Sequence, residues 1–315
     1  MSTTQVREAA SGGWEFVMVT QGWTRRQFFT RAATAGAVAL GGPALLSACG
    51  DGDDGEPRGR GGNTLERARE QGLVRVGIAN EPPYTEVTAS GEVTGVEPDV
   101  LRAVLKNLGI DEIEGIVTPY DQMIPGLQAD RWDVVAAGLF MKQSRCAEVL
   151  YSEPTIVSTE SFAVLAGNPE GITTVASVKE NSGVKVAALG GAFEEGILQD
   201  AEVPEDQIVP VQDGRSGIEA VKAGRADAFF LPTLSLNDLL EGDDEMEVTD
   251  AVEDAPVTGA GHAFRKDDTE FHEEYNAALA EMKESDEYAD ILAEWGFNAS
   301  DVEGVTTEEL CATEG

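Results

Sequence analysis

The feature that most constrains the fold is a regular alternation of helix and strand signals that begins at Thr64. Amphipathic segments such as EPDVLRAVLKNLG are followed by short apolar runs such as IEGIVT. Short, β-branched runs bounded by polar residues predict buried strands, and such alternation favours α/β units with mainly parallel sheets. We expect helices at 64–72, 97–109, 120–130, 193–201 and 217–224, and strands at 73–80, 113–118, 132–139, 184–189, 207–212 and 226–231.

One pattern occurs twice. The segments GLQADRWDVVAAG (126–138) and AVKAGRADAFFLP (220–232) align at a shift of 94 residues, so that Asp133 matches Asp227. Each predicts an amphipathic helix, a tight turn and a buried strand. Similar units far apart in the chain favour two lobes over one long sheet, although helix–turn–strand units also converge on such sequences.

Two extended segments are expected to join the lobes. Residues 151–169 carry the chain from the first lobe to the second, and residues 255–268 carry it back. Residues 271–297 have apolar side chains at helical spacing and are predicted to pack on the first lobe through Tyr275, Leu279 and Met282. The first lobe then comprises residues 64–160 and 256–315 and the second residues 161–255, with a hinge between them.

Composition excludes several classes of protein. The chain has 315 residues, 42% of them hydrophobic, which is typical of a globular protein. The net charge is -36, so nucleic acid is not an expected partner. We interpret the acidity as a solvated surface, of a kind that suits high salt. The two histidines and three cysteines have no metal-site spacing, and no EF-hand loop occurs, so no metal is predicted.

The first residues resemble an export signal rather than part of the fold. Arg25 and Arg26 form a twin-arginine pair, and an interrupted apolar stretch too short to span a membrane follows. It ends in Leu-Ser-Ala before Cys49, which resembles a lipobox whose cysteine becomes the lipidated N-terminus. We therefore expect a lipoprotein signal at 1–48 and a polar tether at 49–63; the alternative is an ordinary cleaved signal.

Two cysteines remain in the predicted globular part, Cys146 and Cys311. Outside the membrane a disulfide between them is allowed. Their separation in sequence says nothing about their geometry, so the sequence leaves this pairing open.

From about Thr64 to Phe297 the chain resembles the solute-binding proteins of ABC importers for polar amino acids and related solutes. The resemblance is carried by the order and spacing of LVRVGIANEPPY, GVEPDVLRAVLKNLG, MIPGLQADRWDVVAAGLF, YSEPTIV, AFRKDD and LAEWGF. It implies a two-lobed, type II periplasmic-binding-protein fold with two hinge crossings. Within that class NEPPY, GIVTPYDQMIPGL, GLFMKQSRC and EVPEDQIV are closest to ectoine- and hydroxyectoine-binding proteins.

The resemblance implies a site for a ligand carboxylate. Arg145 matches the family's arginine, and its planar fork suits a bidentate grip on a carboxylate. Backbone groups of Gly138 and Phe140 are expected to help. The amide of Phe193, at the start of a predicted helix, is a further expected donor, since helix N-termini favour anions. The alternative for Arg145 is a surface arginine near Glu148.

The other end of the ligand is where the sequence departs from amino-acid binders. They have an aspartate after the second-lobe strand for the α-ammonium group, and Pro232 stands there in this chain. Tyr84, Tyr120 and Phe140 match the aromatic positions of ectoine binders and can surround a delocalised cation by cation–π attraction. Glu81 is expected to accept from the ring nitrogens. Alternatively, the aromatic residues only pack the core.

These expectations favour a lipid-anchored, extracytoplasmic binding protein that delivers a small zwitterion to ABC permease subunits. Lobe closure on the ligand is the expected mechanism, with a monomeric protein and no cofactor. An enzyme on this fold would need a general acid or base, for which Glu81 is the one evident candidate. The serious alternative is a binder of a polar amino acid or of another compatible solute such as a betaine.

Overall fold

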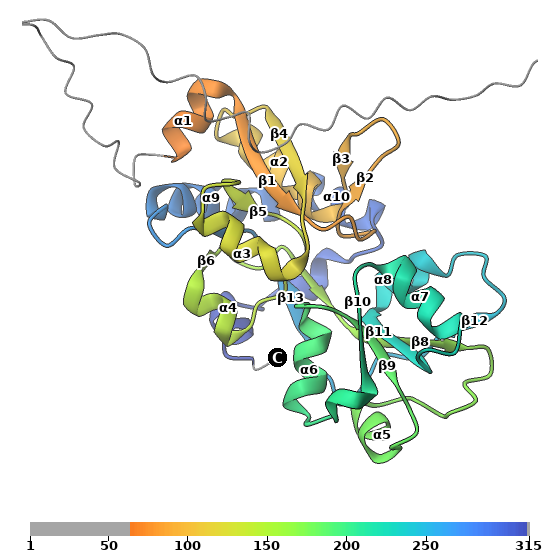
Figure 1. Cartoon of the computed structure of the whole chain (residues 1–315). Helices are drawn as coiled ribbons and strands as arrows, with labels where there is room; N and C mark the ends of the chain where they lie inside the picture. Colours follow the sequence, from red (N-terminus) through yellow and green to blue (C-terminus); the bar gives the residue numbers. More distant parts are fainter. Residues whose placement is uncertain (1–63, 314–315) are drawn as a thin grey trace, which may run out of the picture. The chain divides into compact units, whose positions relative to one another are not determined.

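The computed structural model describes residues 64–313, in which helices and strands alternate as the sequence predicts (Figure 1). The predicted signal at 1–48, Cys49 and the tether at 49–63 lie outside the described residues.

The first sheet forms the centre of lobe 1. Its five strands are ordered β4-β1-β5-β14-β6. Strand β1 pairs in parallel with β4 and β5, whereas β14 pairs antiparallel with β5 and β6. The strands are β1 Leu73–Ile78, β4 Glu112–Val117, β5 Val134–Val135, β6 Leu150–Tyr151 and β14 Ala263–Phe264.

The second sheet forms the centre of lobe 2 and repeats this plan, in the order β10-β9-β11-β8-β12. Strands β10, β9 and β11 are parallel, β8 pairs antiparallel with β11, and β12 pairs antiparallel with β8. The expectation of mainly parallel pairing therefore holds for three strands of each sheet. The strands are β8 Glu160–Leu165, β9 Val186–Leu189, β10 Ile208–Val211, β11 Ala228–Pro232 and β12 Met246–Val248.

Helices connect the strands of each sheet. They are α1 Thr64–Gln71, α2 Val96–Asn107, α3 Tyr120–Gln128, α4 Gln143–Glu148, α5 Val175–Glu180, α6 Phe193–Asp200, α7 Gly214–Lys222, α8 Thr233–Leu239, α9 Thr269–Lys283, α10 Asp286–Glu294 and α11 Thr307–Cys311. A small hairpin, β2 Glu86–Val87 with β3 Val93–Thr94, and 3-10 turns at Glu205–Gln207 and Ala299–Val302 complete the described chain.

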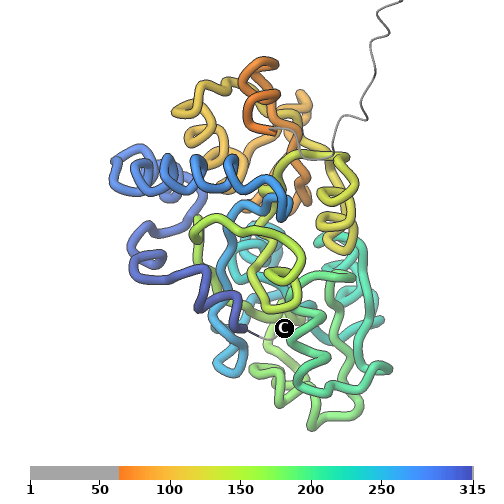
Figure 2. Tube along the Cα trace, turned by 90° about the vertical axis from the view of Figure 1, so that its left-hand side faces the viewer, coloured from red at the N-terminus to blue at the C-terminus, as the bar shows by residue number. Residues whose placement is uncertain are grey.

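The C-terminal helical segment is two helices, not one. Helix α9 ends at Lys283, and Ser285 is the N-cap of α10, because its hydroxyl oxygen accepts from the Tyr288 amide at 3.3 Å. The packing prediction is confirmed: Tyr275, Leu279 and Met282 are buried, and α9 contacts α2. In Figure 2 this blue helix lies across the outside of lobe 1.

The two lobes are joined by a pair of crossing strands. Strand β7 Ile156–Ser158 lies in the outgoing segment and β13 Thr258–Ala260 in the returning one. They pair antiparallel, with Ser158 opposite Thr258. The two crossings predicted from the sequence therefore run side by side and form a separate two-stranded sheet between the lobes.

The internal repeat is visible in the structure. Helices α3 and α7 begin and end 94 residues apart, and each is followed by a residue with positive φ, Asp130 at 57° and Gly224 at 66°. Asp133 and Asp227 then form the same two hydrogen bonds with one residue of the neighbouring segment. Each amide donates to a carbonyl there, of Arg75 or Lys185, and each carboxylate accepts that residue's amide.

The strand predicted at 132–139 is shorter than expected. Only Val134–Val135 pair as a strand. Beyond them the chain turns at Gly138, whose φ is 63°. That left-handed conformation breaks an extended strand and suits glycine, since a Cβ there would lie 2.7 Å from the Tyr84 ring. Beyond the sheet, Ala136, Ala137 and Leu139 are buried in the core, and Gly138 lines a pocket between the lobes.

A disulfide joins Cys146 in α4 to Cys311 in α11, 165 residues apart. It ties the C-terminal end of the described chain to the helix that carries Arg145.

Candidate functional site

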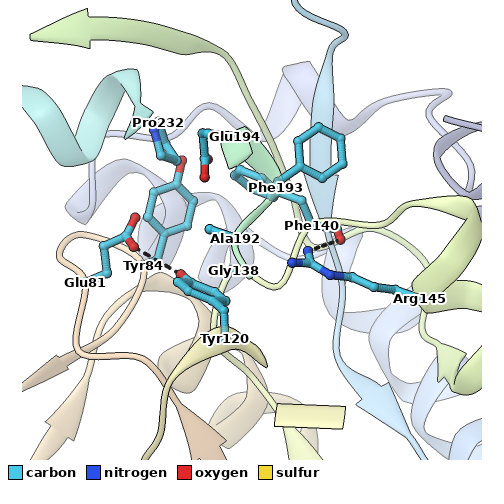
Figure 3. Close-up of a pocket in the computed structure, with 10 residues that line it drawn as sticks. All are labelled: Glu81, Tyr84, Tyr120, Gly138, Phe140, Arg145, Ala192, Phe193, Glu194 and Pro232. Atoms are coloured by element: carbon cyan, nitrogen blue, oxygen red, sulfur yellow. Dashed lines mark hydrogen bonds between the residues drawn. The ribbon is translucent and has the colours of Figure 1, made fainter. Parts of the chain in front are cut away.

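A narrow pocket with a volume of about 10 Å³ lies where the two lobes meet (Figure 3). All seven residues proposed from the sequence as ligand contacts line it, together with Pro232. Two further residues of lobe 2, Ala192 and Glu194, complete the lining. The lining residues are Glu81, Tyr84, Tyr120, Gly138, Phe140, Arg145, Ala192, Phe193, Glu194 and Pro232.

Glu81 follows β1 and turns its carboxylate into the cavity. Its Oε1 accepts from the Ser235 hydroxyl of lobe 2 at 2.8 Å, and its Oε2 accepts from the Tyr120 hydroxyl at 3.2 Å. Burial raises the pKa of the Glu81 carboxyl to about 7; the charge of Glu194 adds to this, and the two hydrogen bonds oppose it. The Glu81 carboxyl is therefore expected to ionise when a cation binds beside it, because a nearby positive charge favours the ionised form.

Tyr84, Phe140 and Phe193 form an aromatic wall that packs in the core and also lines the cavity. Tyr84 meets Phe140 edge to face, with ring centroids 5.8 Å apart, and Phe140 meets Phe193 in the same way. The Tyr84 hydroxyl is hydrogen-bonded to Ser158 at 2.5 Å. Tyr84 and Phe140 thus belong to the hydrophobic core and also line the cavity, so the packing alternative and the site alternative describe the same side chains.

Arg145, in α4, is only 7% exposed, which rules out a surface arginine beside Glu148. Its Nη1 donates to the Phe140 carbonyl at 2.7 Å and its Nη2 to the Gly191 carbonyl of lobe 2 at 2.9 Å. Within residues 64–313 it has no ion-pair partner. Burial lowers the pKa of its guanidinium, although it remains a cation. An anionic ligand group would complete its environment.

Lobe 2 contributes the start of α6. Phe193 is its first residue and places its ring against Phe140. Glu194 follows and is 2% exposed, with its carboxyl in the cavity lining. Burial raises the pKa of this carboxyl overall, although its own backbone amide and the charges of Arg145 and Lys142 oppose the shift.

Hydrogen bonds across the cavity hold the lobes together. Arg145 reaches Gly191 and Ser235 reaches Glu81, so each lobe donates once to the other. A wider cleft adjoins the cavity and shares Glu81 and Tyr120 with it. It runs between the segments after β4 and after β9.

Sequence reasoning did not find Glu194 or Ser235. A glutamate in the first turn of a helix is common, because it complements the helix dipole and normally points to solvent. Its burial here depends on packing against lobe 1, for which the sequence carries no local signal.

Two further findings bear on function. Between Thr64 and Thr313 no His, Cys, Asp and Glu side chains are grouped as a metal ion would require. In the same part of the chain no helix is both long and apolar enough to span a membrane.

Residues 74–299 match the family model of bacterial extracellular solute-binding proteins, family 3. A curated relative, the probable amino-acid ABC transporter periplasmic-binding protein y4tE of Sinorhizobium fredii (strain NBRC 101917 / NGR234), is 33% identical over 263 residues, which cover 80% of this chain and 87% of that protein.

Among solved structures, that of EhuB in complex with hydroxyectoine is similar with a TM-score of 0.78 and 44% identity, over 80% of this chain and 99% of that one. An ancestral amino acid-binding protein, AncCDT-1, described as a precursor of cyclohexadienyl dehydratase, is similar with a TM-score of 0.65 and 26% identity over 74% and 98% of the two chains.

The chain therefore belongs to the family 3 extracellular solute-binding proteins, which bind small solutes for ABC importers of the polar amino acid class. Its two-lobed mixed α/β architecture is that of the type II binding proteins. The family is one of solute binders rather than enzymes.

Proposed function

We propose that this protein captures ectoine or hydroxyectoine outside the cytoplasm and delivers it to an ABC importer. The observation that carries the proposal is the pocket in Figure 3. An arginine with no ion-pair partner in the described part of the chain, a buried carboxylate and an aromatic wall surround one small space. Ectoine is a compact zwitterion made of a cyclic amidine and a carboxylate. The 44% identity to EhuB, whose structure contains hydroxyectoine, supports the same ligand class.

Each part of such a ligand has a counterpart. Arg145 takes the carboxylate, helped by the backbone at Gly138 and Phe140 and by the Phe193 amide. Glu81 accepts from the ring nitrogens, and Tyr84, Tyr120 and Phe140 surround the ring, each contributing roughly 0.5–2 kcal/mol of cation–π attraction. Because Arg145 and Glu81 already contact lobe 2, the ligand would stabilise the closed arrangement that the permease recognises.

We also propose that Cys49 carries a lipid anchor after twin-arginine export, with residues 49–63 as a tether, lobe boundaries at 160 and 255, and a monomeric protein. Mass spectrometry of the membrane-extracted protein tests the anchor: a diacylglycerol-modified N-terminal Cys49 is expected. Recovery of an unmodified N-terminus at another residue would overturn it.

The second candidate is a binder of a polar amino acid. Glu194 favours it, because this second buried carboxyl lies in the lining with Pro232 and offers an acceptor for an α-ammonium group. Curated relatives at 26–28% identity include arginine- and histidine-binding proteins of Escherichia coli (strain K12).

Isothermal titration calorimetry of the purified protein separates the two candidates. Ectoine, hydroxyectoine, glycine betaine, glutamine and arginine are titrated in turn. We expect tight binding of ectoine or hydroxyectoine and weak or no binding of the amino acids. Tight amino-acid binding with negligible ectoine heat would show that the proposed ligand is wrong.

A further inference from the structure

Arg145 lies on a helix that has little of its own to hold it in place. Helix α4 has six residues, and Arg145 is the only one of them that is buried. The helix follows Lys142, whose side chain forms no capping hydrogen bond. Because a helix this short is not stable by itself, contacts with the rest of the fold must fix its position.

The C-terminal segment of the described chain supplies such contacts. We call residues 306–313, which contain α11, the C-terminal brace. The disulfide joins Cys311 of the brace to Cys146, the residue after the arginine. The Gln143 amide, two residues before the arginine, donates to the Thr313 carbonyl at 2.9 Å. The brace therefore contacts α4 on both sides of the arginine.

The brace is itself fixed to lobe 1. Thr306 and Glu309 form a capping box at the start of α11. The Thr307 hydroxyl donates to the Ser152 carbonyl, just after β6, at 2.8 Å. Leu310 is 5% exposed and belongs to an apolar cluster of lobe 1 against which both disulfide cysteines pack. The brace can therefore act as a rigid support for α4.

Leu310 also connects the brace to the strands that join the lobes. It lies against Gly259 of β13, since a Cβ on that glycine would be 2.5 Å from the Leu310 Cδ1. The Gly259 carbonyl accepts from the amide of Met141, just before α4, at 2.9 Å. Strand β13 pairs with β7 between the lobes. The brace, the start of α4 and the returning crossing strand therefore meet at one place.

The function of Arg145 depends on how its guanidinium is oriented. Its two terminal nitrogens donate to the Phe140 carbonyl of lobe 1 and the Gly191 carbonyl of lobe 2. A bidentate grip on a carboxylate requires the planar group to face it, and binding groups must be held within about 0.5 Å of their working position. A shift of α4 would therefore weaken ligand binding even in a protein that stays folded.

The disulfide could also act on stability alone. Its cysteines are 165 residues apart, and a cross-link over so long a loop stabilises a fold mainly by constraining the unfolded chain. That effect changes unfolding but leaves the affinity of the folded protein unchanged. The location of the cross-link beside the arginine, together with the contact between the brace and β13, favours a positioning role.

We propose that the Cys146–Cys311 disulfide and Leu310 are positioning residues for ligand binding, which hold α4 and so fix the Arg145 guanidinium relative to β13. This inference rests on the function proposed above, because it needs Arg145 to bind the carboxylate of the solute. It applies to a cyclic zwitterion and to an amino acid alike, since both carry a carboxylate.

Isothermal titration calorimetry with hydroxyectoine tests the disulfide. The double variant Cys146→Ser/Cys311→Ser removes the cross-link, and we expect its affinity to fall about tenfold because the guanidinium is less well oriented. A double-mutant cycle with Arg145→Ala gives a readout that a merely stabilising role would not move. In the Arg145→Ala background, loss of the disulfide should change the affinity by less than about twofold.

Reduction of the folded wild-type protein repeats this test without a substitution. Both cysteines are partly exposed, so a phosphine reductant can reach them. We expect the same loss of affinity, with recovery on reoxidation, and thiol titration reports the extent of reduction. The double serine variant should not respond to the reductant. Reduction also decides the question if that variant does not fold.

Leu310→Ala tests the brace with the disulfide left intact. Loss of the contact with Gly259 should weaken hydroxyectoine binding about threefold or more, because α11 and α4 can then shift against β13. Leu240→Ala is the matched control, since this leucine is also buried and ends α8 in lobe 2. It should lower the melting temperature as well but keep the affinity within about twofold of wild type.

The outcomes separate the two roles and the two proposals. Wild-type affinity in the double serine variant, an undiminished loss in the Arg145→Ala background, or equal losses in Leu310→Ala and Leu240→Ala would overturn the positioning role. If the wild-type protein does not bind hydroxyectoine, glutamine and arginine become the probes; the proposed ligand is then wrong and the same variants still test the positioning role. A protein that binds none of these solutes would overturn the proposed function, and this inference with it.

Discussion

The two repeated units share one local pattern that forms the framework of each lobe, and they differ where they line the site. In each lobe a helix, a left-handed turn residue and an aspartate lead into a strand. Asp133 and Asp227 make the same amide exchange with the neighbouring strand. Since this part is shared, it serves the fold.

The units differ at their ends, and these ends line the cavity. Helix α3 starts with Tyr120, whose hydroxyl reaches Glu81, whereas α7 starts with Gly214 behind a capping box made by Asp213. After the strands, Gly138 and Pro232 occupy matching positions 94 residues apart, and both line the cavity. The two lobes therefore have the same scaffold. Each lobe lines the cavity with residues that have no equivalent in the other.

The largest expected effect distinguishes the shared aspartates. Asp133 is buried and accepts from Arg67 at 2.5 Å and from Arg75 at 2.7 Å, with Arg265 close by, whereas the Asp227 carboxylate accepts only from the Lys185 amide within residues 64–313. Asp133→Ala removes charge-assisted hydrogen bonds to the partly exposed Arg67 and Arg75 and should cost up to about 3 kcal/mol of unfolding free energy. Asp227→Ala should cost about 1 kcal/mol. Urea unfolding measures both, and equal losses would show that the charge network of lobe 1 adds nothing.

The next largest effect is expected from removal of the Arg145 guanidinium. Arg145→Ala should weaken binding of the proposed zwitterion about a hundredfold, since charge-assisted hydrogen bonds to the carboxylate disappear. Arg225→Ala, on the exposed turn of the lobe 2 repeat, is the matched control and should bind within twofold of wild type. If Arg145→Ala kept its affinity within a few-fold, the carboxylate would bind elsewhere.

The matched strand ends should also respond differently. Gly138→Ala puts a methyl group 2.7 Å from the Tyr84 ring at a positive φ, so it should cost about 1–3 kcal/mol of stability and weaken ligand binding. Pro232→Ala keeps an ordinary φ and should cost about 0.4–1 kcal/mol through the unfolded state. Thermal unfolding with and without ligand tests this; a silent Gly138→Ala would contradict the close approach.

The smallest expected effect is a pH dependence of cation binding. With the pKa of Glu81 at about 7 in the ligand-free site, the carboxyl is mostly ionised at pH 8 and mostly neutral at pH 6. Affinity for a cationic ring should fall about tenfold between these values, because binding must displace the proton.

The same shift affects stability with a defined sign. Since folding raises the pKa of Glu81, its contribution favours the ligand-free folded state below pH 4.5 and is lost as pH rises through 7. Calorimetry at several pH values checks the binding effect. Glu81→Gln should bind weakly with a flat profile from pH 6 to 8, and a slope that persisted in this variant would assign the proton to another group.

The sequence predicted which residues line the site better than it predicted which charged groups are buried there. Seven proposed contacts lie around one cavity because strand ends and helix starts, which local patterns reveal, meet there. The strand expected at 132–139 is shorter, since the chain turns at Gly138 and the apolar residues before this turn are buried in the core without pairing. Glu194 was missed because a glutamate's burial cannot be read from its neighbours in sequence.

What the sequence determined by itself is the alternation of elements, the 94-residue repeat and the two crossings, since these depend on periodicity and turn chemistry within a few residues. The tertiary structure decided which charged groups are buried and which lobe satisfies them. Ser235 reaches Glu81 across 154 positions, and the Tyr84 hydroxyl meets Ser158 across 74. The first of these contacts forms only when the lobes pack together, and burial in the folded chain then gives Arg145, Glu81 and Glu194 their chemistry.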